Sequence, residues 1–213
     1  MSGDRLVVFI HGLGEGPEVW DAQVRALPPG FIALAVNAFG AEVDEGFSIG
    51  RSAREIALEM DRLGVASAHI CGLSLGAMVA LQIAVDYPAR VLTLRLAAGQ
   101  VRPPKALLRV QRAIMALLPK TFFAHRGADK PQMLAVLKSV ERIDFSNELA
   151  SVVAPTLVLC GSKDRANLPA ARALAAGIPN AELRVLAGAG HQSHLDAPGA
   201  FASALGAVLQ KSD

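Results

Sequence analysis

Short apolar runs alternate along the chain with longer segments in which apolar residues recur at helical spacing. Six of these runs are nearly continuous in apolar side chains, which is typical of strands buried on both faces of a parallel sheet. The alternation predicts an α/β fold with a mostly parallel sheet of about six strands and helices on both faces. The predicted strands are Arg5–Ile10, Phe31–Val36, Ala68–Cys71, Val91–Ala97, Thr156–Cys160 and Glu182–Leu186.

Helical patterns fill the spaces between these strands. Ser48 is predicted to cap a helix that begins near Arg51 and carries Ile56, Met60 and Leu63 on one face. A proline after Tyr87 ends another helix, because the residue before proline is disfavoured in the helical region. The helix that this proline ends is Leu75–Val85. The remaining predicted helices are Pro169–Ala176 and a last one after Pro198, with Phe201, Ala204, Leu205, Val208 and Leu209 on one face.

The stretch of about residues 100–147 breaks this alternation. Its clearest patterns are helical, over Leu107–Leu118 and Gln132–Val140, and it contains no good strand. It is predicted to be a helical insertion between the fourth and fifth strands, and a candidate lid. We therefore expect residues 1–213 to form one α/β domain that carries this short lid.

Composition supports a globular protein and excludes some partners. Hydrophobic residues make up 52% of the chain and charged residues 19%, which argues against disorder. The net charge of +2 does not suggest a nucleic-acid partner. The charge is uneven, however. Val101–Arg142 holds nine Lys or Arg residues and two acids, so the rest of the chain is acidic overall.

Three features bear on where the protein resides. Cys71 and Cys160 each end an apolar run before a glycine, which predicts buried thiols in a reducing compartment. Leu63–Val85 has no formal charge, but small and polar residues interrupt it, so no membrane span is predicted. The first apolar run is too short for a secretion signal and ends at His11. A cytoplasmic location is expected.

A serine flanked by glycines follows the third predicted strand and opens a helix. The motif reads Gly72-Leu73-Ser74-Leu75-Gly76. Such a turn suits a nucleophile, because its strained backbone projects the hydroxyl above the sheet and glycines allow neighbouring backbones to approach. The motif predicts Ser74 as a nucleophile. The alternative is an ordinary turn between two core elements.

A nucleophilic serine needs a base and an acid that orients the base. Asp164 follows the strand Thr156–Cys160, and His191 follows Glu182–Leu186 through a glycine-rich turn. Since the carboxyl ends of parallel strands share one edge of a sheet, both side chains are expected near Ser74. Their order along the chain, serine then acid then histidine, is typical of one class of serine hydrolase.

Other side chains compete for these roles. His194 is an alternative base, but it lacks the glycine-rich turn. His11, His191 and His194 together have no cysteine or carboxylate at a supporting ligand spacing, so neither a metal nor a cofactor is predicted. The alternative acids are Asp86, Asp144 and Asp196.

The loop after the first strand has the sequence His11-Gly12-Leu13-Gly14. Such a loop can aim a backbone N–H group at a developing oxyanion. Leu13 and Leu75 are the predicted donors, and His11 is expected to orient the loop. An ordinary strand-to-loop turn is the alternative.

With these motifs, nearly the whole chain resembles the α/β-hydrolase superfamily, particularly its small esterase, lactonase and haloperoxidase-like members. The resemblance implies a Ser74, Asp164 and His191 triad. The matching segments are Val8–Gly14, Gly72–Gly76, Pro155–Asp164 and Gly188–His191, the last followed by Pro198.

The chain also departs from this superfamily. Members usually carry two strands before the one that ends here at His11, so a six-stranded sheet that lacks the usual first two strands is expected. After the second strand members often show Asp-x-Pro-Gly-x-Gly-x-Ser, whereas this chain has Asn37-Ala38-Phe39-Gly40. That difference affects the shape of one side of the pocket and not the triad.

The leading hypothesis is hydrolysis of a small-molecule carboxylic ester, lactone or thioester through an acyl-enzyme. A serine nucleophile disfavours the dehalogenase and epoxide-hydrolase branches, which the resemblance associates with aspartate. Alternatives are a carbon–carbon bond hydrolase or lyase that uses the same triad, and a non-catalytic binding protein.

The basic excess of the insertion motivates a second hypothesis about the substrate. Arg102, Arg109 and Arg112 fall close together on one helical segment. They are candidate contacts for an anionic acyl group or an anionic carrier. A solvated helix face explains them equally well.

Overall fold

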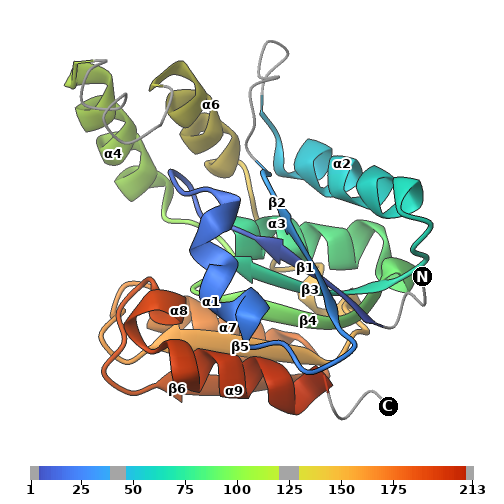
Figure 1. Ribbon diagram of the computed structural model, residues 1–213. Coiled ribbons are helices and arrows are strands. Elements are labelled where there is room, and N and C mark those ends of the chain that lie inside the picture. Colours follow the sequence, from blue (N-terminus) through green and yellow to red (C-terminus); the bar gives the residue numbers. More distant parts are fainter. Residues whose placement is uncertain (1–4, 39–46, 120–129, 210–213) are drawn as a thin grey trace.

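The computed structural model describes residues 5–38, 47–119 and 130–209 (Figure 1). Six strands form one sheet in the order β2-β1-β3-β4-β5-β6, and every neighbouring pair is parallel. The predicted α/β fold and its six-stranded parallel sheet are therefore confirmed. The strands are β1 (Leu6–Ile10), β2 (Ile32–Val36), β3 (Ala68–Leu73), β4 (Val91–Ala97), β5 (Thr156–Gly161) and β6 (Ala181–Leu186).

Side chains of the central strands alternate between two hydrophobic cores. In β1, Val8 and Ile10 join the core on one face of the sheet, and Val7 and Phe9 join the core on the other. All five residues of this strand are buried. Because both faces are covered, the strand reads as an unbroken apolar run in the sequence.

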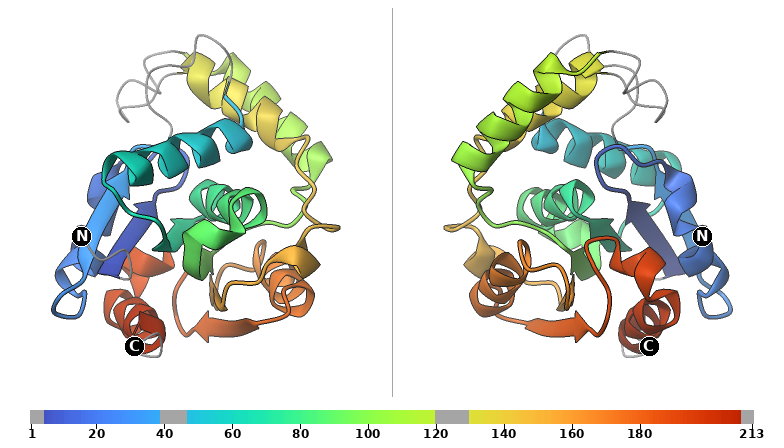
Figure 2. Two further views of the ribbon diagram at one scale, coloured as in Figure 1. Left: turned by 90° about the vertical axis from the view of Figure 1, so that its right-hand side faces the viewer. Right: turned by 90° about the vertical axis from the view of Figure 1, so that its left-hand side faces the viewer.

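Helices cover both faces, as Figure 2 shows from two sides. One core is shared by α2 (Ile49–Arg62), α3 (Leu75–Asp86) and α7 (Leu168–Gly177). The other lies under a 3-10 helix (Pro17–Trp20), α1 (Asp21–Arg25) and α9 (Pro198–Leu209).

Local sequence signals explain several helix ends. The Ser48 side chain accepts a hydrogen bond from the backbone N–H of Arg51 at 3.1 Å, so the predicted N-cap of α2 is confirmed. Tyr87 leaves the helical region immediately before Pro88, which ends α3. The described residues of the predicted apolar face of α9 are all buried, namely Phe201, Ala204, Leu205 and Leu209.

The insertion after β4 contains α4 (Lys105–Leu117) and α6 (Lys130–Val140), which pack against each other (Figure 1). Its described residues, 100–119 and 130–147, include no strand. Residues 120–129 of the predicted insertion lie outside the described chain. The ammonium of Lys130 donates to the carbonyls of Ala116 at 2.7 Å and Leu118 at 2.6 Å, so the start of α6 is bonded to the end of α4.

Cys71 and Cys160 are buried free thiols, as their positions at strand ends predict. Burial raises the pKa of the Cys71 thiol to about 12. A thiol with so high a pKa is protonated at neutral pH and therefore unreactive. Within the described ranges, no helix is both long and apolar enough to cross a membrane.

A buried polar network lies on β3 and β4. Arg95 is fully buried, donates from one guanidinium nitrogen to Thr93 Oγ1 at 2.8 Å and from the other to the carbonyl of Leu205 in α9 at 3.3 Å. His69 Nδ1 lies 2.8 Å from the same Thr93 hydroxyl. Burial lowers the pKa of Arg95 to about 10, so the guanidinium is still charged at neutral pH.

Candidate active site

Ser74 occupies a strained turn between β3 and α3. Its φ is 54° and its ψ is −113°, a conformation that non-glycine residues rarely adopt. The backbone N–H of Ser74 donates to the carbonyl of Ala97 at the end of β4, at 2.7 Å. Strain of this kind costs about 1–3 kcal/mol and is concentrated at functional sites.

Two glycines allow the loops around this turn to approach one another. A Cβ on Gly76 would overlap the backbone carbonyls of Ile10 and His11 at the end of β1. A Cβ on Gly161 would overlap the carbonyl of Gly190, in the loop that precedes His191. Any side chain at either position therefore pushes neighbouring strand ends apart.

Asp164 and His191 are hydrogen-bonded, with 2.9 Å between Asp164 Oδ2 and His191 Nδ1. The carboxylate accepts, so Nδ1 carries the proton and Nε2 is left as the basic nitrogen. The Asp164 side chain is only 6% exposed, whereas that of His191 is 46% exposed. The acid is thus shielded from water while the imidazole reaches the cavity that contains Ser74.

Asn167, three residues after Asp164, contacts both members of this pair. Its Nδ2 lies 2.8 Å from Asp164 Oδ1, 2.9 Å from Asp164 Oδ2 and 3.1 Å from His191 Nδ1. Its Oδ1 accepts from Gln100 Nε2 at 2.5 Å. Neither Asn167 nor Gln100 was predicted from the sequence. The Asp-x-x-Asn spacing just before Pro169 is the signal that was available for the first of them.

The loop after β1 is held by side chains on either side of it. His11 is 1% exposed, and its Nδ1 lies 2.8 Å from the carbonyl of Gly12. The carboxylate of Glu15 accepts from the backbone N–H of Gly12 at 2.8 Å and from the side-chain amide of Gln192 at 2.6 Å. Glu15 therefore connects this loop to the residue that follows His191.

A cavity of about 650 Å³ brings the predicted site residues together. Ser74, His191, Leu13 and Leu75 all line it, and Asp164 lies behind His191. Side chains of α4 and α6 also line it, so the insertion covers the site as a lid does. Its size is typical of small-molecule sites.

Arg102, Arg109 and Arg112 do not line this cavity. Arg102 pairs with Asp144 at 3.3 Å, and Arg109 and Arg112 pair with Glu141 at 3.7 Å and 3.0 Å. Their contact with a substrate stays a prediction. The acids of the insertion hold them in ion pairs, which helical spacing alone does not show.

The competing candidates occupy other surroundings. His194 is fully buried, with its ring centroid 4.8 Å from that of Trp20, and it does not line the cavity. Asp196 lines the cavity but accepts the backbone N–H of Gly190 at 2.7 Å. Asp144 pairs with Arg102 and accepts from Ser146. Within residues 5–38, 47–119 and 130–209, no cluster of His, Cys, Asp or Glu suited to a metal is found.

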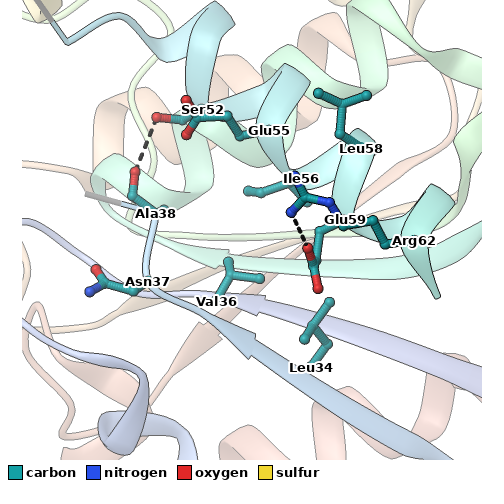
Figure 3. A pocket seen from close by; sticks show the side chains of 10 residues that line it. All are labelled: Leu34, Val36, Asn37, Ala38, Ser52, Glu55, Ile56, Leu58, Glu59 and Arg62. Atoms are coloured by element: carbon teal, nitrogen blue, oxygen red, sulfur yellow. Dashed lines mark hydrogen bonds and ion pairs between the residues drawn. The ribbon is translucent and has the colours of Figure 1, made fainter. Parts of the chain in front are cut away.

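A second cavity of about 620 Å³ lies between the edge strand β2 and α2 (Figure 3). It is lined by apolar side chains of β2 such as Leu34 and Val36 and by Glu59 and Arg62 of α2, which pair at 2.8 Å. The one hydroxyl there, that of Ser52, donates to the carbonyl of Ala38. None of the residues predicted for catalysis lines this cavity.

Comparison with known proteins gives the family. Residues 7–204 match the family model described as Alpha/beta hydrolase family. A putative carbamate hydrolase, RutD, of Serratia proteamaculans is 28% identical over 87% of this chain and 83% of its own length. The dihydrolipoyllysine-residue acetyltransferase component of the acetoin cleaving system of Cupriavidus necator is also 28% identical. There the match covers 92% of this chain but only 61% of that relative.

Solved structures share the fold. An esterase from Thermogutta terrifontis superposes with a TM-score of 0.85 at 23% identity, covering 97% of this chain and 90% of that one. The enol-lactonase from Burkholderia xenovorans superposes with a TM-score of 0.79 at 24% identity, covering 97% and 91%. The match to the family model spans most of the sequence, and the parallel sheet agrees with it. The chain therefore belongs to the alpha/beta hydrolase family, and its activity is that of a hydrolase.

Proposed function

We propose that the protein is a serine hydrolase that cleaves a carboxylic ester, lactone or thioester through an acyl-enzyme on Ser74. The observation that carries this proposal is the 2.9 Å hydrogen bond between Asp164 and His191, beside a cavity that Ser74 also lines. A base with a fixed tautomer next to a hydroxyl on a strained turn is the arrangement that activates a serine.

The proposed reaction has two halves. Ser74 Oγ attacks the substrate carbonyl carbon while His191 Nε2 takes the hydroxyl proton. The bond from that carbon to the leaving oxygen or sulfur then breaks, and the leaving group receives the proton from His191. In the second half, water attacks the carbonyl carbon of the acyl-enzyme and gives a proton to His191. The bond between that carbon and Ser74 Oγ then breaks, the acid is released, and Ser74 Oγ takes the proton from His191. Asp164 stabilises the imidazolium in both halves.

The oxyanion is assigned to the backbone N–H groups of Leu13 and Leu75. Leu75 opens α3, and the first N–H groups of a helix have no acceptor within the helix. Leu13 lies in the loop that Glu15 and His11 hold in place. Each such donor typically contributes about 10²–10³ in rate. The RutD relative is named a putative carbamate hydrolase, and a carbamate, like an ester, has a carbonyl carbon, which supports hydrolysis at a carbonyl carbon here.

Labelling with a fluorophosphonate probe tests the nucleophile. The wild-type protein and the control Ser151→Ala should be labelled at equal rates, because Ser151 is an exposed serine that does not line the cavity and whose hydroxyl donates to the carbonyl of Glu148. Ser74→Ala should not be labelled, and its kcat with a p-nitrophenyl ester should fall at least about 10⁴-fold. Equal turnover by Ser74→Ala would refute the proposal. Labelling of Ser74 without turnover of any ester would instead favour carbon–carbon bond cleavage.

A further inference from the structure

The side of the cavity formed by the insertion is apolar. In α6, the lining residues Met133, Val136, Leu137 and Val140 recur at the spacing of one helix face. In α4, Leu108 and Met115 line the cavity together with Gln111. Opposite the lid, Leu13, Leu75 and Met78 complete the apolar lining. The wall that α4 and α6 present to an acyl chain on Ser74 is therefore apolar except for Gln111.

The charges that line the cavity are negative. Among the described residues, no lysine or arginine lines it, whereas Glu15 and Asp196 do. Both carboxylates accept backbone N–H groups in the loops that carry Leu13 and His191. The two carboxylates therefore hold these loops through hydrogen bonds, and they also make the electrostatic potential of the site more negative.

Several described basic residues of the insertion bind other groups of the insertion. Glu141, whose side chain is 14% exposed, pairs with both Arg109 and Arg112. The ammonium of Lys130 donates to the carbonyl end of α4. The positive charges of Arg109, Arg112 and Lys130 are thus used within the insertion, and no described lysine or arginine lines the cavity.

We propose that the site accepts uncharged substrates with an apolar acyl chain and discriminates against acyl groups that end in a carboxylate. This inference rests on the proposed function. A carboxylate placed under the lid loses water without gaining a cationic partner, and an unpaired buried charge is strongly unfavourable. Methylene groups in the same place gain the transfer free energy of leaving water.

A chain-length series measures the apolar part of this proposal. Each methylene buried under the lid contributes about 0.8 kcal/mol, which is roughly a fourfold change in kcat/KM. The kcat/KM of p-nitrophenyl hexanoate should therefore exceed that of p-nitrophenyl acetate by roughly 10²-fold. Values that are equal, or that fall with chain length, would overturn the proposal.

A matched pair of probes measures the charge discrimination. The p-nitrophenyl monoester of adipic acid has the same six-carbon acyl chain as p-nitrophenyl hexanoate, but its chain ends in a carboxylate. The kcat/KM of the adipate monoester should be at least about tenfold lower. A ratio smaller than this, or one that favours the adipate monoester, would overturn the proposal.

Neighbouring residues of α4 offer a matched pair of variants. Met115 lines the cavity, whereas Ile114 is 56% exposed and does not line it. Met115→Lys should raise the adipate-to-hexanoate ratio of kcat/KM about tenfold, because the new ammonium can pair with the terminal carboxylate. Ile114→Lys adds the same charge outside and should leave the ratio as in the wild type. Identical ratios in the two variants would show that the cavity lining does not set the discrimination.

The same measurements separate this inference from the proposed function. If p-nitrophenyl hexanoate is hydrolysed no faster by the wild type than by Ser74→Ala, the proposed function itself fails. If hydrolysis depends on Ser74 but the hexanoate and adipate esters react alike, only the inference about substrate charge fails.

Discussion

Asn167 donates from its side-chain Nδ2 to both carboxylate oxygens of Asp164, at 2.8 Å and 2.9 Å. The carboxylate is buried, so its orientation toward His191 depends on the few groups that contact it. Gln100 holds Asn167 through the other end of the amide, and Gln100 lies in the segment that joins β4 to the lid. Asp164 is therefore positioned by Asn167, and Asn167 is in turn held by Gln100 at the start of the insertion.

Removing this amide should slow turnover more than it weakens substrate binding. Asn167→Ala is expected to lower kcat about tenfold with little change in KM, because it removes hydrogen bonds to a charged acceptor behind the base. Asn167→Asp should be worse, about a hundredfold, since it places a second carboxylate against Asp164 although it preserves side-chain size. Steady-state kinetics with a p-nitrophenyl ester measure both.

An exposed asparagine provides the control for these variants. Asn180 lies between α7 and β6, where its side chain donates to the carbonyl of Val153, and Asn180→Ala should retain wild-type kcat. If Asn167→Asp were as active as the wild type, Asn167 would have no positioning role. Thermal unfolding of each variant separates a kinetic effect from a loss of folded protein.

Gly76 should not tolerate a side chain. A Cβ there overlaps the carbonyls at the end of β1, and backbone atoms of a central strand cannot move without disturbing the sheet. Gly76→Ala is expected to lower the free energy of unfolding by about 3 kcal/mol. Chemical denaturation measures the change.

Gly206 supplies the matched control for this substitution. It lies within α9, and nothing is within 4 Å of the position that its Cβ would occupy. Gly206→Ala should therefore raise the free energy of unfolding by about 0.5–1 kcal/mol, because alanine favours the helix. Equal effects of the two substitutions would contradict the proposed close approach at Gly76.

Thr93 is the shared hydrogen-bond partner of the buried Arg95 and His69. Thr93→Val keeps the shape of the side chain but leaves the guanidinium with one acceptor fewer. A loss of about 2–3 kcal/mol in the free energy of unfolding is expected, since an unpaired buried donor on a charged group is costly. Denaturant unfolding at neutral pH measures it.

Two further variants show whether the charge of Arg95 is the cause. Thr156→Val removes a buried hydroxyl that donates only to the carbonyl of Ala154, and it should cost about 1 kcal/mol. In an Arg95→Met background, Thr93→Val should lower the free energy of unfolding by less than it does in the wild type, because there is then no buried guanidinium that lacks an acceptor. A cost that is the same in both backgrounds would refute coupling between Thr93 and Arg95.

His194 should make the folded state sensitive to acid. Burial lowers its pKa, with smaller opposing effects from Glu15 and Asp196 and a reinforcing one from His191. A depressed pKa in the folded state means that the unfolded chain takes up the proton first. Stability is therefore complete above the ordinary value of 6.5 and falls as the pH drops below it, toward the lowered pKa of the folded state.

His194→Phe should remove this contribution. The imidazole packs against the rings of Trp20 and Phe201, so a phenyl ring fits the same apolar surroundings. The difference in unfolding free energy between His194→Phe and the wild type should grow in favour of the variant from pH 7.5 to pH 5. A difference independent of pH would show that His194 is not the titrating group.

The sequence determined the fold because each strand and helix is encoded by a pattern of neighbouring residues. Strands buried on both faces read as unbroken apolar runs, and helices between them read as 3.6-residue periods, so the parallel sheet could be predicted. Ser74, Asp164 and His191 were predicted at one edge of that sheet because parallel strands place their carboxyl ends together. The structure shows the Asp164–His191 hydrogen bond and the cavity at that edge. Their catalytic roles stay predictions.

Only the tertiary structure decided which partners the polar side chains have. The basic excess of the insertion suggested an anionic substrate. The structure pairs the three arginines with Glu141 and Asp144, and apolar side chains of α4 and α6 line the cavity that Ser74 also lines. Gln100 meets Asn167 across 67 positions of sequence. Hydrogen bonds and ion pairs act over about 3–4 Å between groups that the fold brings together, and no periodicity in a sequence encodes that separation.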